Sequence, residues 1–410
     1  MNIEETIFLS LLKDFLQDEN VAVLPETVDW NGLHEIAKSQ SLQGVCYRQL
    51  KQMKAAGKEV PLEVLDRFHK DFLSEIYYAA NRQEEMKRLN ELFLKESIAV
   101  LPFKGWDVKE KWNEPLLRTM GDIDLLIHEK DRLASDRLLM EEGYTKYIDN
   151  DAVWTYQGKD ITLELHSHMF YEHLTGNVDY QAYFDKAWDY YGTPLWESFH
   201  FVYLIGHLAK HLINHGIGFR VFLDLSFLSR SFLDWEWIVC ELKKIELYDF
   251  AARCFSLCSL WFSMEIPVSI ECADLNLLKT MSEKLFRDGT FGLENKENQS
   301  AHAAKELLYT GKDYSYGSVK LTLHRLFPPY RDMRLVPWYS FVDGRPWLLP
   351  AAWIYRWWYC LRNKKKASWN MLVEPLQCKD AILKRQEYLY QWGLVKKNQG
   401  SQEDGCYEKE

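Results

Sequence analysis

The sequence lacks any apolar run long enough to cross a bilayer. Its most hydrophobic stretch, Trp347 to Leu361, is interrupted by Pro350 and Arg356, and it falls short of the roughly 20 residues that a transmembrane helix needs. This aromatic run, with basic residues after it, could lie on an anionic membrane surface. A buried helix with a solvated end explains the same pattern, so we expect no transmembrane segment and no peripheral membrane contact.

The eight cysteines lack the paired spacing of a zinc ribbon. The closest two, Cys254 and Cys258, lie one helical turn apart in an apolar segment and are expected to be small core residues. The first six residues, Met1 to Thr6, are acidic and lack the basic start of a secretory signal. We therefore expect a cytoplasmic protein.

An excess of positive charge is also lacking. The chain has 50 basic and 60 acidic residues and a formal net charge of −10. A protein that coats DNA gains its affinity by neutralising phosphates, so this balance argues against general DNA binding. A small nucleotide needs no basic surface. The length of 410 residues exceeds a single ordinary core and predicts two domains, or one domain with a large extension.

The most informative stretch is Arg118–Ile127, where a glycine precedes two aspartates and an apolar run. In a strand, Asp122 and Asp124 share one face, while the alternate apolar residues face the other way. Two carboxylates this close repel each other unless a cation lies between them, and Mg²⁺ prefers such oxygen ligands. The alternative interpretation is an ordinary strand edge with two solvated aspartates.

Both flanks of this stretch favour the metal site. Upstream, 99–105 reads as a strand that ends in Lys104 and Gly105, and 106–113 has helical spacing. A glycine at such a turn lets the backbone approach a phosphate, and the helix N-terminus adds donors. Downstream, 160–166 alternates, so that Thr162, Glu164 and His166 share one face. Glu164 is therefore a candidate third carboxylate.

Three segments, Leu101–Gly105, Arg118–Ile127 and Leu163–His166, resemble in this order an uncharacterised bacterial nucleotidyltransferase family of the DNA polymerase beta-like superfamily. The resemblance extends over nearly the whole chain. Its further matches are Gly206–His211, Arg220, Asp224, Leu326–Pro329 and Trp347–Pro350.

The resemblance implies that Asp122, Asp124 and Glu164 are catalytic and hold two Mg²⁺ ions, with Mn²⁺ as a possible substitute. The reaction would move a nucleoside monophosphate from an NTP to an unidentified hydroxyl acceptor on a small molecule, a protein or an RNA end. The residues that it implies for nucleotide binding are Lys104, Gly105, Arg118, Gly121, His207, His211, Arg220 and Asp224.

One departure from the family pattern supports a second hypothesis. The superfamily usually has Gly-Gly or Gly-Ser at the phosphate turn, whereas this chain has Gly105 and Trp106. Lys104 or Arg118 would then supply the positive charge. The departure favours a catalytically silent nucleotide-binding or interaction protein on the same fold, and the retained carboxylates favour an enzyme.

The predicted fold is α+β, with a small mixed sheet as the nucleotidyltransferase core and large helical extensions on both sides. We predict a helical lead-in over 1–96, the core over 97–190, a helical C-terminal domain over 191–396 and a polar, disordered tail over 397–410. Within the lead-in, apolar periodicity predicts helices over 4–16, 33–53 and 61–97, with Asp29 as the N-cap of the second.

One group of three residues and one pair in the helical C-terminal part carry open alternatives. His207, His211 and His215 recur at every fourth position of a predicted helix. They could bind a transition metal, as in a hydrolase, contact phosphate or base in the cleft, or be ordinary helix histidines. Arg220 and Asp224 are also one turn apart, so they form either an exposed ion pair or a cleft pair in which Asp224 orients Arg220 toward phosphate.

Overall fold

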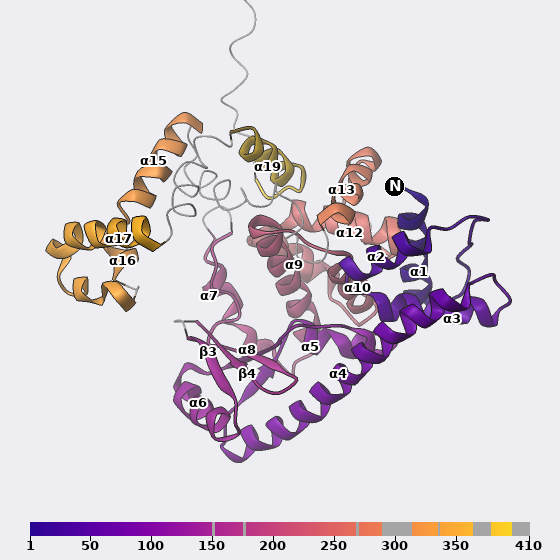
Figure 1. Cartoon of the computed structure of the whole chain (residues 1–410), viewed down its shortest axis with the longest axis horizontal. Helices are drawn as coiled ribbons and strands as arrows, with labels where there is room; N and C mark the ends of the chain where they lie inside the picture. Colours follow the sequence, from indigo (N-terminus) through magenta and orange to yellow (C-terminus); the bar gives the residue numbers. More distant parts are fainter. Residues whose placement is uncertain are drawn as a thin grey trace, which may run out of the picture. The chain divides into compact units, whose positions relative to one another are not determined.

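A computed structural model of the protein describes residues 1–149, 152–174, 178–267, 270–288, 314–334, 337–363 and 379–395 (Figure 1). The chain divides into two compact units. One comprises Met1–Leu212 and Gly216–Glu294, and the other Ile213–His215 and Asn295–Glu410. The domain boundaries expected from the sequence stay predictions, and the predicted tail over 397–410 lies outside the described residues.

The N-terminal part is helical, as predicted. Its helices are α1 (Ile3–Gln17), α2 (Trp30–Ser39), α3 (Gln43–Ala55) and α4 (Leu62–Lys95). Asn2 and Glu5 form a capping box at the start of α1. The carboxylate of Asp29 accepts hydrogen bonds from the backbone N–H groups of Asn31 and Gly32, so this predicted N-cap is confirmed.

The single helix predicted over 33–53 is wrong, because the chain forms two helices there. Ser41 adopts a left-handed backbone with φ of 55°, which ends α2 and lets α3 begin in a new direction. The apolar periodicity continued across the break since Leu42 is itself fully buried. Periodicity therefore indicated burial correctly but not the turn.

The α+β core contains a five-stranded mixed sheet in the order β1-β2-β5-β4-β3. Its strands are β1 (Val100–Pro102), β2 (Ile123–Ile127), β3 (Thr145–Asp149), β4 (Val153–Gln157) and β5 (Thr162–His166). β2 and β5 are parallel, and the other neighbours are antiparallel. Each strand expected from the alternation is present, so the prediction of a small mixed sheet is confirmed.

One face of this sheet packs on an apolar core. Alternate residues of β2 and β5 point into it, and α4 and α6 (Arg132–Glu141) supply the other side. In Figure 1 the C-terminal half of α4 lies beside α6 and the sheet, while α3 lies near its N-terminal half. The buried residues from the sheet and the two helices are Met86, Leu89, Phe93, Ile123, Leu125, Ile127, Leu138, Leu139, Trp154, Tyr156, Leu163 and Leu165.

The opposite face of the sheet meets α9 (Trp196–Asn214). The ring of Phe103, just after β1, contacts the rings of His166 on β5 and Tyr203 on α9, with centroids 5.2 and 5.5 Å apart. All three residues are buried. The polar side chains of β2 and β5 therefore lie on the face that α9 covers.

Short elements connect β1, β2 and the helical part. They are α5 (Gly105–Val108), η1 (Lys109–Lys111), η2 (Pro115–Leu117), η3 (Glu129–Asp131), α7 (Tyr180–Phe184) and α8 (Ala187–Tyr190). The helix expected over 106–113 is thus a single α-turn followed by a 3₁₀ turn. One turn has few aligned peptide dipoles, so it offers a phosphate much less than a full helix would.

The remaining helices of the first unit are α10 (Phe219–Leu228), α11 (Trp235–Lys244), α12 (Tyr248–Phe262) and α13 (Leu275–Asp288). Phe8 of α1 packs against Phe219 of α10, with ring centroids 5.8 Å apart. Cys254 and Cys258 of α12 are buried, as predicted. The lead-in and the later helices therefore share a core.

The described part of the second unit is helical. Its elements are α15 (Tyr314–Leu326), α16 (Tyr330–Met333), η5 (Pro337–Val342), η6 (Pro346–Leu348), α17 (Leu349–Asn363) and α19 (Lys379–Gln391). Met333, Tyr339, Val342 and Ala352 form a small apolar cluster in it. None of the helices among the described residues is sufficiently long and apolar to span a membrane.

Candidate functional site

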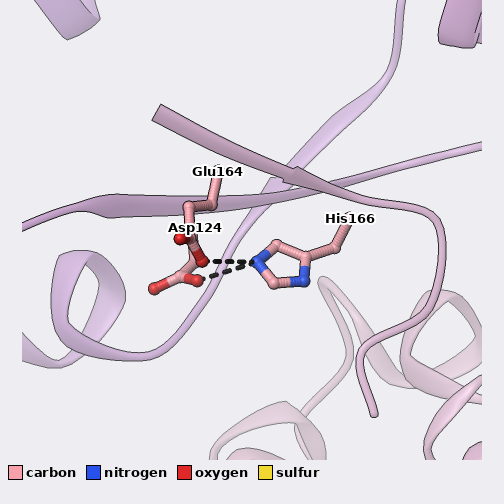
Figure 2. A group of neighbouring side chains, drawn as sticks. All are labelled: Asp124, Glu164 and His166. Atoms are coloured by element: carbon pink, nitrogen blue, oxygen red, sulfur yellow. Dashed lines mark hydrogen bonds and ion pairs between the residues drawn. The ribbon is translucent and has the colours of Figure 1, made fainter. Parts of the chain in front are cut away.

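Two carboxylates and an imidazole converge where β2 and β5 lie side by side. The parallel pairing sets Asp124 opposite Glu164 and Leu126 opposite His166, the arrangement that the alternating patterns predicted for the two acids. One ligand atom from each of Asp124, Glu164 and His166 lies within 4.8 Å of the others (Figure 2). Among the described residues, this is the group that could hold a metal ion.

His166 was not among the site residues predicted from the sequence. Its ring Nε2 lies 2.8 Å from Oδ1 of Asp124 and 3.6 Å from Oε2 of Glu164, so it points between the two carboxylates (Figure 2). The alternation over 160–166 already put it on the same face as Glu164. Its other ring nitrogen, Nδ1, is buried and has no hydrogen-bond partner among the described residues.

Asp122 lies one residue before β2 and is exposed, whereas Asp124 is buried. Its carboxylate is not part of the close group of three. The residue is open to solvent on one side, but the protein around its carboxylate reduces hydration there. This desolvation, followed by repulsion from Asp124 and Glu164, raises the pKa of Asp122, and the charge of Lys104 opposes the change. Asp122, Asp124 and Glu164 together form the acidic edge of the site, and the role of Asp122 as a metal ligand stays a prediction.

Lys104 neutralises Asp124 inside the protein. Its Nζ lies 2.5 Å from Oδ1 of Asp124, and both side chains are largely buried. Burial alone would raise the pKa of Asp124, but Lys104 and His166 outweigh it and hold the pKa below its usual range. Burial likewise opposes the charge of Lys104, and Asp124 reverses the effect and raises its pKa. Both groups are therefore charged at neutral pH.

The backbone of Lys104 is strained. Its φ of 54° and ψ of −135° lie in a region that residues with a side chain rarely occupy. The N–H of Lys104 donates a 3.0 Å hydrogen bond to Nε2 of His200, a fully buried residue of α9. The other ring nitrogen of His200 lies 2.9 Å from the carboxylate of Asp107. These contacts hold the strained turn and aim the lysine at Asp124.

Arg118 and Asp224 form a buried bidentate ion pair. The Nε and Nη2 atoms of Arg118 donate to the two carboxylate oxygens of Asp224 at 3.2 and 2.6 Å, and the indole N–H of Trp112 donates to the same carboxylate at 2.9 Å. The guanidinium of Arg118 lies directly over Gly105, where an added Cβ would be 2.6 Å from Cζ. Gly105 is therefore covered by Arg118, and its role in binding nucleotide stays a prediction.

Arg220 and Asp224 do not form the direct i, i+4 ion pair proposed from the sequence, because Arg118 contacts both carboxylate oxygens of Asp224, although the charge of Asp224 still favours the protonated form of Arg220. Nη1 of Arg220 donates instead to the carbonyl and hydroxyl oxygens of Thr119, each at 3.0 Å. Burial, and then repulsion from Arg118, lowers the pKa of Arg220 to about 10. Thr119 lies three residues before Asp122, so Arg220 braces the segment that leads into the acidic edge.

Two of the predicted histidines contact each other on α9. The Nε2 atoms of His207 and His211 are 2.9 Å apart, which requires one ring to donate and the other to accept. Burial, followed by repulsion from His211 and Lys104, lowers the pKa of His207 well below its usual value. His207 is therefore neutral and lies near Lys104. His215 falls beyond the end of α9 at Asn214, so the three do not continue along one helix.

Gly121, the last of the predicted nucleotide-binding residues, lies open beside Asp122. It is exposed, and a Cβ added to it would meet nothing within 4 Å. Its lack of a side chain is thus not required by packing, in contrast to that of Gly105.

A cavity of about 280 Å³ adjoins the acidic edge. It is lined by one face of α4, by residues 41 and 43, and by 106–120. Glu75 of α4 lies in this lining. Burial, and then repulsion from Asp71, raises its pKa to about 8, although a 2.9 Å hydrogen bond from the N–H of Gly44 and the charge of Arg220 oppose the change. Glu75 is thus largely protonated at neutral pH.

Comparison with known proteins identifies a family that matches the part of the chain carrying this site. Residues 26–263 match a family described as uncharacterised nucleotidyltransferases. The matched range includes every residue of the acidic edge and the helices on both sides of it. Neither a curated protein nor a solved structure matches the chain.

The packing of Arg118 over Gly105 generates the first prediction. Gly105→Ala is expected to lower the free energy of unfolding by about 1–3 kcal/mol, because the new methyl group must push aside a guanidinium that Asp224 holds. Urea unfolding followed by tryptophan fluorescence measures the change. Gly121→Ala is the matched control and should stay within about 0.5 kcal/mol of the parent. Equal effects of the two substitutions would contradict the packing described here.

The raised pKa of Glu75 predicts a pH dependence of stability. Between pH 4.5 and about 8 the folded chain keeps a proton on Glu75 that the unfolded chain has released. The free energy of unfolding therefore falls as the pH rises through this window. In Glu75→Gln this contribution is absent, so the melting temperature should decline less between these pH values. Glu91→Gln is an exposed change on the same helix, and its melting temperature should decline as that of the parent does. Parallel curves of melting temperature against pH for all three proteins would refute the assignment.

Proposed function

Because the chain belongs to a family of nucleotidyltransferases, we propose that it is a divalent-cation-dependent enzyme that transfers a nucleoside monophosphate from an NTP to a hydroxyl acceptor. The observation that carries this proposal is the convergence of Asp124, Glu164 and His166 within 4.8 Å beside the buried Lys104. The polymerase beta-like ancestry, the bacterial origin and the cytoplasmic location expected from the sequence stay predictions.

The donor atoms of this group fit a divalent cation. Asp124 and Glu164 offer carboxylate oxygens, which Mg²⁺ and Mn²⁺ prefer. His166 adds an imidazole nitrogen, a ligand that Mn²⁺ accepts more readily than Mg²⁺. When bound there, the cation would offset the negative charge that the triphosphate brings to the acidic edge. His166 could serve either as a ligand or as the donor that orients Asp124.

The residues around this group suit the proposed reaction. The acceptor oxygen forms a bond to the α-phosphorus, the bond from that phosphorus to the leaving pyrophosphate breaks, and the acceptor proton passes to the acidic edge, where Asp122 is open to solvent. Lys104 keeps Asp124 ionised and oriented. Lys210 of α9 lies near both Lys104 and Asp124 and is 3.3 Å from the carboxylate of Glu172, so the α9 side places two lysines beside the acidic edge.

One observation favours the alternative, a catalytically silent nucleotide-binding protein on the same fold. Arg118 covers Gly105 and is itself tied to Asp224, so the turn after β1 has no bare backbone to offer a phosphate. If the phosphates depend on that turn, binding would be weak and transfer absent. Lys104 and Lys210 then become the decisive phosphate contacts.

Isothermal titration with each NTP, with and without Mg²⁺ or Mn²⁺, tests the binding half of the proposal. We expect binding that requires the cation and that weakens by about 10–100-fold in Glu164→Gln. This substitution removes the charge of a ligand and keeps the shape of the side chain. Glu129→Gln, an exposed change shortly after β2, should bind like the parent. NTP binding that is undiminished in both Glu164→Gln and Asp122→Asn would overturn the metal assignment.

Product formation separates the enzyme from its silent alternative. The full chain is incubated with α-labelled NTPs, divalent cation and a cell extract separated into small molecules, RNA and protein. The proposal expects label in one of these fractions and its loss in Glu164→Gln, because the reaction needs the acidic edge. Cation-dependent NTP binding without labelled product in any fraction would support the silent alternative.

A further inference from the structure

The cavity lies beside the segment that leads into the acidic edge. Arg118, Thr119 and Met120 line it, and Gly121 and Asp122 follow them directly in the chain. A molecule in this cavity therefore lies near the carboxylates without displacing α9. Its volume of about 280 Å³ is at the lower end of the range for small-molecule sites, so it suits a small metabolite better than a nucleic acid.

The cations of the lining are already engaged by the protein. Arg118 is held by Asp224. Lys109 lies 3.5 Å from Glu110 and 3.5 Å above the ring centroid of Trp106. Arg82 donates to the carbonyl oxygens of Met120 and Asp160, at 2.8 and 3.2 Å. A triphosphate would find little unpaired positive charge here. On the α9 side, Lys104 and Lys210 lie near each other, and each is paired with one carboxylate, of Asp124 and of Glu172.

Two acceptor groups in the lining are left without donors of matching strength. Glu75 forms no ion pair with any described residue, and its carboxyl group accepts a hydrogen bond from the N–H of Gly44. The Oε1 atom of Gln43 is buried and has no hydrogen-bond partner among the described residues. A buried acceptor without a donor is costly, so both groups favour a ligand that brings hydrogen-bond donors.

The position of Glu75 is built into the backbone. A Cβ on Gly44 would overlap its carboxylate, so glycine at this position is what admits the side chain. Asp71, one turn earlier on α4, is held by Nε2 of His34 at 2.7 Å. Ser74 and Tyr78 complete this wall of the cavity.

We propose that this cavity is the acceptor site and that it takes a small hydroxylated molecule with a protonated amine, which Glu75 and Gln43 bind through its donors. Calling this cavity an acceptor site rests on the proposed function, but the binding chemistry does not depend on that function. The ammonium group pairs with the carboxylate of Glu75, which releases its proton when the ligand binds, and one of the hydroxyl groups points toward Asp122.

The test uses three sugars of one shape and different charge: glucosamine, glucose and glucuronate. Their binding to the full chain is measured by isothermal titration and by saturation-transfer NMR, without NTP and without metal. We expect glucosamine to bind at least about tenfold more tightly than glucose, and glucuronate to bind most weakly. Glu75→Gln, which keeps the acceptor for the N–H of Gly44, should remove the advantage of glucosamine, and Glu91→Gln should preserve it.

Several outcomes would overturn the proposal: no detectable binding of glucosamine, equal binding of the three sugars, preference for glucuronate, or an unchanged preference in Glu75→Gln. Circular dichroism and cation-dependent NTP binding of Glu75→Gln are measured on the same samples to exclude misfolding. If the parent binds glucosamine selectively but binds no NTP, the proposed function fails and the cavity assignment stands. If NTP binds and the sugars do not, the cavity assignment fails and the proposed function stands.

Discussion

The buried ion pair between Lys104 and Asp124 is the interaction on which the acidic edge depends. A carboxylate sealed beneath α9 would be neutral or destabilising without a cation beside it, and removing one partner of such a pair typically costs about 3–5 kcal/mol. Lys104 reaches Asp124 because its backbone is held in a strained turn by His200 and Asp107. The strand pairing then adds Glu164 and His166 to the same place. Strain in one residue of the turn is thus offset by contacts from two helices.

The helices around the sheet separate two chemical environments. On the α9 side, Lys104 and Lys210 lie close to Asp124, and the neutral His207 lies near Lys104. On the α4 side, the arginines are tied to Asp224 and to backbone carbonyls, and Glu75 remains as an acceptor. Anions and donor-bearing molecules would therefore approach the carboxylates from different sides. This division needs no movement of the chain, because each side chain that creates it is already held by a neighbour.

Local patterns in the sequence predicted most of the sheet and the facing of its acids. Period-2 alternation in 122–127 and 160–166 fixes which residues share a face, and this holds whatever the partner strands are. Ion pairs between distant segments produce no such local pattern. No sequence feature near Arg118 indicates that its partner is Asp224, more than 100 residues later. The break at Ser41 could not be predicted from periodicity, because Leu42 continues the apolar pattern across it. His166 lay on the predicted face, but the two aspartates and Glu164 were predicted as the metal ligands. One of these aspartates, Asp122, lies outside the strand.

The two outer strands of the sheet have a further consequence. β1 is three residues long and ends at Pro102, which has no N–H to offer a neighbouring strand. At the other edge, the register of β3 slips between Lys146 and Ile148, and such a bulge interrupts the ladder of free backbone groups. Both borders are poor templates for another β-strand. Other proteins that dock on this domain would do so through side chains and helices, and not by lengthening the sheet that carries the acids.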